Sequence, residues 1–221
     1  MLAVLTTLAL NSAAQNTVYS VNTVGIVGVV PGSNQYIAIC NPLTNTSVPN
    51  TIGNLIGTNL PVGGKILKWN YAGVHFDIYT RVFFGNGWSP PTAQATTLNP
   101  GEGFFVQSPV QITNTFVGDV LDARYYGTQT NSLRSGFELV GSKQPLTDSM
   151  PNLGLSIPYS ASGGFFNQIL KWDITAQHYD FYRRSSFGIG WVPTIPTNNP
   201  GAGFFVELNA PFTWVQNFTV H

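Results

Sequence analysis

The chain has 221 residues, of which 43% are hydrophobic, 13% are aromatic and only 8% are charged. Nine basic and nine acidic residues leave no net charge, which argues against nucleic acid or an anionic membrane surface as the partner. A disordered chain would need more charge and fewer aromatic residues, so we expect a folded protein whose polar surface is built from uncharged side chains.

The amino-terminal segment, residues 1–17, is apolar and has two interpretations. The stretch from Leu2 to Leu10, followed by small residues, is typical of a secretory leader, although no basic residue precedes it, and it is too short to span a bilayer. If the segment is retained, its alternating side chains predict a strand that is apolar on both faces and packs only by donation to a neighbouring copy. The residues expected to contact that neighbour are Val4, Leu5, Thr6, Leu8 and Leu10.

Glycine and proline punctuate the rest of the chain, and no long segment has a helical period, so we predict an all-β fold. In the first half, strands are expected at 21–30, 35–40, 64–70, 74–83, 103–108 and 111–118, with a short helical turn at 51–56. The only cysteine, Cys40, cannot form an intramolecular disulfide, and its apolar surroundings predict a half-buried strand residue.

Much of the sequence occurs twice. Ile66–Trp69 recurs 103 positions later, and Gly103–Val106 recurs 100 positions later, after a three-residue deletion. A repeat of roughly 100 residues is a whole small domain. Strands of the second copy are expected at 121–128, 136–141, 167–173, 177–186, 203–208 and 212–220. We therefore predict two tandem homologous β-sandwich domains, Ig-like or jelly-roll-like, at 18–120 and 121–221, with the N-terminal segment as an extra strand.

One repeated strand carries a row of polar residues on one face, because alternate side chains of a strand point the same way. The row consists of His75, Asp77, Tyr79 and Arg81 in the first copy and of His178, Asp180, Tyr182 and Arg184 in the second. Histidine and aspartate can bind metal or transfer protons, but a metal site needs three or four convergent ligands and a hydrolase needs a second carboxylate. We therefore interpret the row as a structural ladder that fixes strand register, and we predict no catalytic residue, metal or cofactor.

The aromatic residues give a second set of candidates. Trp69 and Trp172 lie in apolar strand runs and are expected in the core. Trp88 and Trp191 follow Gly-x-Gly turns, where an exposed ring could stack on a sugar; the alternative is burial, as for most large aromatic residues. Asn45 and Asn217 begin glycosylation sequons and are candidate sites of a glycoprotein.

Residues 18–25 (VYSVNTVG), 41–43 (NPL) and 98–106 (LNPGEGFFV) carry a resemblance. They resemble stretches of a group of secreted, often tandem-duplicated β-domain proteins of environmental bacteria such as the Verrucomicrobia. The resemblance covers most of the chain after residue 17, implies export and a β-rich fold, and brings no catalytic residue with it. In that group, the segment before Val18 resembles a signal peptide. The second copy has Ala202 where the first has Glu102, so the turn does not require this glutamate.

These features favour a non-enzymatic role outside the cell or on its surface. We expect a structural subunit of an extracellular filament or surface assembly that polymerises head to tail with copies of itself, with N-terminal strand donation as one route. The alternative is a secreted carbohydrate-binding or adhesive module that contacts glycans through Trp88 and Trp191. In both cases we expect no membrane span.

Overall fold

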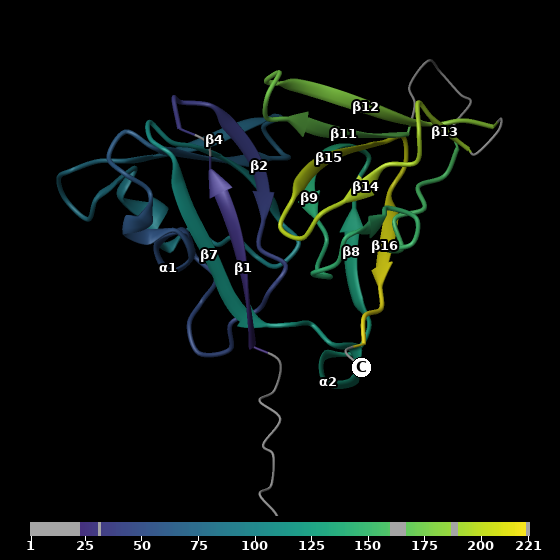
Figure 1. The fold of residues 1–221 in the computed structure, drawn as a ribbon, viewed down its shortest axis with the longest axis horizontal. Helices are drawn as coiled ribbons and strands as arrows, with labels where there is room; N and C mark the ends of the chain where they lie inside the picture. Colours follow the sequence, from purple (N-terminus) through teal and green to yellow (C-terminus); the bar gives the residue numbers. More distant parts are fainter. Residues whose placement is uncertain (1–22, 31, 160–166, 187–189, 220–221) are drawn as a thin grey trace, which may run out of the picture.

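The computed structural model describes residues 23–30, 32–159, 167–186 and 190–219. Figure 1 shows that they form an almost entirely β-stranded molecule, which confirms the predicted all-β class. The elements of the first half are β1 (Thr23–Val30), β2 (Tyr36–Cys40), α1 (Ile52–Leu55), the 3-10 helix η1 (Gly57–Asn59), β3 (Lys65–Asn70), β4 (His75–Arg81), β5 (Trp88–Ser89), the 3-10 helix η2 (Pro91–Ala95), β6 (Gly103–Gln107) and β7 (Ile112–Asp119).

The second half begins with a short helix and continues as strands. Its elements are α2 (Ala123–Tyr126), β8 (Gln129–Leu133), β9 (Gly136–Gly141), β10 (Asp148–Ser149), β11 (Gln168–Asp173), β12 (His178–Arg184), β13 (Trp191–Val192), β14 (Thr197–Asn198), β15 (Gly203–Leu208) and β16 (Phe212–Gln216). No helix among the described residues has both the length and the apolar character needed to cross a bilayer.

Each half combines one five-stranded antiparallel sheet with one two-stranded sheet. The five-stranded sheets have the strand orders β2-β6-β3-β4-β5 and β9-β15-β11-β12-β13, which correspond strand for strand. The two-stranded sheets, β1-β7 and β8-β16, lie on opposite sides of the view in Figure 1. A further short pair joins β10 to β14.

Two short helices show how local sequence decides the elements between the strands. The helical turn predicted at 51–56 is confirmed as α1, where the Thr51 hydroxyl accepts a hydrogen bond from the Asn54 amide. The strand predicted at 121–128 is wrong, because Asp122 caps α2 through the Arg124 amide and Gly127 ends this helix at a φ of 68°. The strand of this region starts later, at β8.

Three hydrophobic clusters hold the molecule together. Phe104 and Val106 of β6 pack toward the β1-β7 side, and Phe204 and Val206 of β15 pack toward the β8-β16 side. The intervening residues, Phe105 and Phe205, point to the opposite face of their strands and meet in a third cluster between the two five-stranded sheets. The repeated Gly-Phe-Phe-Val run is therefore buried on both faces.

Matching hydrogen bonds tie the two halves across this central layer. The Trp69 indole N–H donates to the Phe137 carbonyl oxygen at 2.8 Å, and the Trp172 indole donates to the Tyr36 carbonyl oxygen at the same distance. The Trp69 ring also meets Phe205 edge-on, with 5.2 Å between ring centroids. Both tryptophans therefore belong to the layer between the halves.

The boundary between two domains at residues 120 and 121 stays a prediction. The corresponding strand orders agree with it, but the central cluster and short backbone bridges such as Glu102 to Val140 join the halves into one packed structure. The N-terminal segment, residues 1–17, lies outside the described residues, and so do its predicted contact residues Val4, Leu5, Thr6, Leu8 and Leu10.

Candidate functional site

The polar row of the first half lies along β4, at the surface of the five-stranded sheet. His75 Nε2 lies 3.2 Å from Asp77 Oδ1, and the side-chain amide of Asn70 donates to the other oxygen of this carboxylate at 3.2 Å. Arg81 does not extend this contact, since its guanidinium donates to the Gly87 carbonyl oxygen and lies 5.6 Å from the centre of the Trp88 ring. Tyr79 packs against the hydrophobic cluster of the first half.

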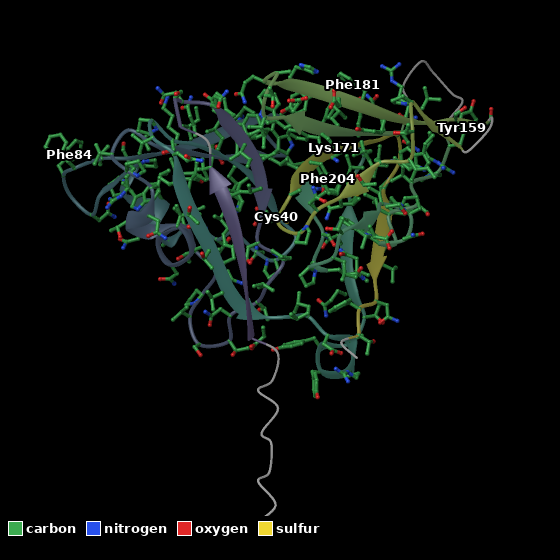
Figure 2. The ribbon with its side chains drawn as sticks, viewed as in Figure 1. Cys40, Phe84, Tyr159, Lys171, Phe181 and Phe204 are labelled. Carbon is green, nitrogen blue, oxygen red and sulfur yellow. The ribbon has the colours of Figure 1, made fainter. Side chains whose placement is uncertain are left out.

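The row on β12 of the second half repeats this geometry. His178 Nε2 lies 3.3 Å from Asp180 Oδ1, while Arg184 donates to the Gly190 carbonyl oxygen at 2.9 Å and lies 5.1 Å from the Trp191 ring. Lys171, labelled in Figure 2, is the cross-strand partner of Asp180. Burial lowers the pKa of the Lys171 ammonium, and Asp180 opposes that shift.

The two His–Asp pairs are solvent-exposed, and exposed ion pairs contribute only about 0–1 kcal/mol to stability. Among the described residues, no three His, Cys, Asp or Glu side chains lie close enough together to hold a metal ion. The interpretation of the rows as structural ladders remains a prediction, in which the arginines fix the hairpin that leads to β5 or β13.

Trp88 and Trp191 are poor candidates for sugar contacts. Each is only 3% exposed, because each packs into the hydrophobic cluster of its own half and lies beside an arginine. Gly87 and Gly190 lie beside the arginine guanidiniums, and both have a positive φ, 83° and 74°, that favours glycine. A sugar-stacking ring must present a face to solvent, so burial removes the basis for glycan contact at both positions.

The two glycosylation candidates lie in different settings. The Asn45 side-chain oxygen accepts backbone hydrogen bonds from Ser47 and Val48, which closes a turn. Asn217 is exposed just after β16. Attachment of sugar at either residue stays a prediction.

A pair of exposed aromatic side chains lies in the hairpin between β4 and β5. Phe83 is 86% exposed and Phe84 is 60% exposed, and their rings touch edge-on with centroids 5.3 Å apart. Figure 2 labels Phe84 at one end of the long axis of the molecule and Tyr159, also exposed, at the other. Apolar side chains therefore mark both ends of the molecule.

A cleft of about 340 Å³ lies at the junction of the two halves. Its walls are the turn before β6 and the hairpin of β8 and β9. The charged side chains that line it are Glu102, Arg134, Glu138 and Lys143. Glu138 is buried and accepts hydrogen bonds from the Arg134 guanidinium and backbone amide. Four charged side chains in one cleft are unusual for a chain that has only nine basic and nine acidic residues.

Comparison of the chain with protein-family models, curated proteins and solved structures finds no match. The resemblance to secreted bacterial proteins therefore stays an expectation.

Sequence reasoning missed both the exposed aromatic pair and the charged cleft. The strand predicted at 74–83 included Phe83, whereas β4 ends at Arg81 and leaves the pair in a loop. A signal for the cleft was present where the two copies differ in charge, as at Glu102 and Ala202. On the other wall, the repeat offset of 103 aligns Glu138 with the uncharged Gln35, whereas strand pairing puts Ile37 at that position, because the pairing of β9 with β15 is shifted by two residues from the repeat alignment.

Proposed function

We propose that this protein is a structural subunit that polymerises head to tail in an extracellular filament or surface assembly. The observation that carries the proposal is the exposed Phe83–Phe84 pair at one end of the molecule. Two large apolar rings on a surface are costly in water and are typical of a contact with another protein. The low charge of the chain supports dense assembly, because neutral copies do not repel one another.

The difference between the two ends favours a head-to-tail contact over a symmetric one. Ser186 occupies the position of Phe83 in the corresponding hairpin of the second half, so the first of the two rings has no counterpart there. The opposite end exposes Tyr159, an aromatic partner for such rings. Contact between unlike surfaces produces an open chain of subunits when the rotation between neighbours does not close a ring.

Strand donation is a second route to the same assembly. Within the described residues, β1 pairs only with β7, so its outer edge is available to another strand. An apolar strand from residues 1–17 of a neighbouring copy would add a ladder of backbone hydrogen bonds there.

The aromatic end is tested by the double variant Phe83→Ser, Phe84→Ser in the full chain. Serine is the residue found at position 186, and both side chains are exposed, so we expect the subunit to stay folded. Burial of one phenylalanine contributes about 1.5–3 kcal/mol, so loss of both should weaken each contact at least tenfold. Sedimentation velocity should show small species in place of polymer.

Val117→Ser is the matched control, since Val117 is an exposed apolar residue on β7, outside the hairpin that carries the aromatic pair. It should leave the polymer intact. A polymer of the same size from the double variant would refute the role of the aromatic pair, and equal loss in the control would show a nonspecific effect.

A further inference from the structure

The charged cleft between the halves has features of a ligand site that the fold itself does not require. Corresponding backbone contacts occur twice: the Gly141 amide donates to the Gly101 carbonyl oxygen at 2.9 Å, and the Cys40 amide donates to the Gly201 carbonyl oxygen at 2.8 Å. At the second junction, Ala202 corresponds to Glu102. The junction is thus built without the cleft carboxylate.

Strand pairing extends this comparison to the other wall of the cleft. Glu138 pairs with Val206, and Ile37 pairs with Val106, so an isoleucine stands where the cleft has a buried glutamate. Burial of a charged group costs several kcal/mol before its partner compensates. The position of Glu138 therefore accepts an apolar side chain, so the fold does not require a charge there. We infer that the charges of the cleft serve to bind a ligand.

Both carboxylates in the cleft are already paired with cations. Glu102 Oε1 lies 2.8 Å from the Lys68 ammonium, and Glu102 Oε2 accepts a hydrogen bond from the backbone amide of Asn99 at 3.0 Å. Glu138 pairs with Arg134. Among the described residues that line the cleft, Lys143 is the cation that is not paired with a carboxylate. Its ammonium donates to the Thr130 carbonyl oxygen at 2.8 Å.

A second hydrogen-bond donor lies beside Lys143. The Asn131 amide nitrogen is buried and has no acceptor among the described residues. A Cβ built on Gly101 would lie 2.8 Å from Lys143 Cγ and 3.1 Å from this nitrogen, so the aliphatic part of Lys143 and the Asn131 amide group lie over the same glycine. An unpaired buried donor in a cleft that is also lined by a lysine favours a bound anion. Burial also lowers the pKa of Lys143, which a bound anion would oppose.

We propose that this cleft binds a carboxylate-bearing sugar. Lys143 and Asn131 bind the carboxylate, while Thr130, Ser132 and the paired Glu102 offer partners for hydroxyl groups. The edge of the cleft also includes Trp69, an aromatic side chain suited to a sugar ring. The cleft volume falls in the range of about 300–1,000 Å³ that is typical of small-molecule sites.

Isothermal titration calorimetry of the full chain with sodium glucuronate tests the proposal, with glucose and acetate as comparison ligands. We expect glucuronate to bind more tightly than either, because glucose lacks the carboxylate and acetate lacks the hydroxyl groups. Lys143→Met should weaken glucuronate binding at least about tenfold, since a charge-assisted hydrogen bond is lost. Lys65→Met removes the same charge outside the cleft and should leave binding unchanged.

Asn131→Asp provides a second variant of nearly the same shape, which places a carboxylate where the ligand carboxylate would bind. It should abolish glucuronate binding even if Lys143→Met proves unstable, and thermal unfolding of each variant controls for folding. The proposal is overturned if the unaltered protein binds no glucuronate, if glucose or acetate binds equally well, or if Asn131→Asp binds as the parent does. The test is independent of polymer formation.

Discussion

Cys40 and Gly141 show how single residues let the two halves approach each other. They occupy corresponding positions, opposite Gly103 and Gly203, at the edges of the two five-stranded sheets. A Cβ on Gly141 would lie 2.1 Å from the Cys40 sulfur, so the thiol fills the space that this glycine leaves open. Cys40 is fully buried, and its burial raises the pKa of the thiol from 9.0 to about 12.

This burial predicts an unreactive cysteine. At pH 8 the folded protein should not react with a thiol reagent such as Ellman's reagent, because the thiolate is absent and the sulfur is inaccessible. The unfolded chain should react with one equivalent. The rate of labelling with Ellman's reagent, followed in native buffer and in urea, measures both states. Rapid labelling of the native protein would contradict the structure.

The same shift fixes the sign of a pH effect on stability. The thiol of the unfolded chain ionises near its ordinary pKa, whereas the folded thiol keeps its proton to about pH 12. The contribution of Cys40 to the free energy of unfolding is therefore complete below pH 9 and falls as pH rises between 9 and 12. A Cys40→Ala variant should lack this part of the alkaline slope.

At the residue scale, the sequence predicted the environment of a residue better than its structural counterpart in the other half. The apolar run around Cys40 predicted a half-buried strand residue; the structure confirms the strand but buries the side chain completely. The 103-residue offset of the repeat makes Lys143 the counterpart of Cys40, whereas strand pairing makes Gly141 its counterpart. The difference arises because register depends on the pairing of distant strands, which a single sequence does not display.

At the scale of elements, the central strands β6 and β15 connect the hydrophobic clusters, because both faces of each strand are buried. Phe105 and Phe205 each belong to the cluster between the sheets, and their neighbours face the separate clusters of the two halves. The sequence indicated these strands as apolar runs. It could not indicate that one face of each run would meet the other half.

Truncation in the central layer tests this arrangement. Phe205→Ala removes a ring that meets Trp69, Phe76, Phe137 and Tyr179 edge-on, and it should lower the free energy of unfolding by about 3–5 kcal/mol. Urea denaturation followed by tryptophan fluorescence measures the loss. Because the layer is shared, we expect one transition before and after the change. A loss below about 1 kcal/mol, or a second half that unfolds alone, would contradict the role of this layer.

At the scale of the whole molecule, the two ends of the long axis expose different aromatic side chains. One end carries the exposed rings of Phe83 and Phe84, and the other carries Tyr159. The duplication was visible in the sequence and predicted two similar bodies. Which loops would mark the ends depended on how those bodies pack, and that could not be predicted from the repeats alone.

The proposed assembly depends on these ends and on the N-terminal strand, and the two routes are separable. Removal of residues 1–15 should abolish polymerisation if strand donation joins the subunits, while near-ultraviolet circular dichroism should show that the remaining protein stays folded. If the aromatic end is sufficient, the truncated protein should still polymerise and the double serine variant should not. Normal polymers from a chain that carries both the truncation and the two serine substitutions would contradict both routes.

Negative-stain electron microscopy of the native, full-length protein tests the central proposal most directly. Head-to-tail contact of unlike ends predicts unbranched filaments with a repeat that corresponds to one subunit. Uniform single particles at high protein concentration would contradict the proposed role as a structural subunit.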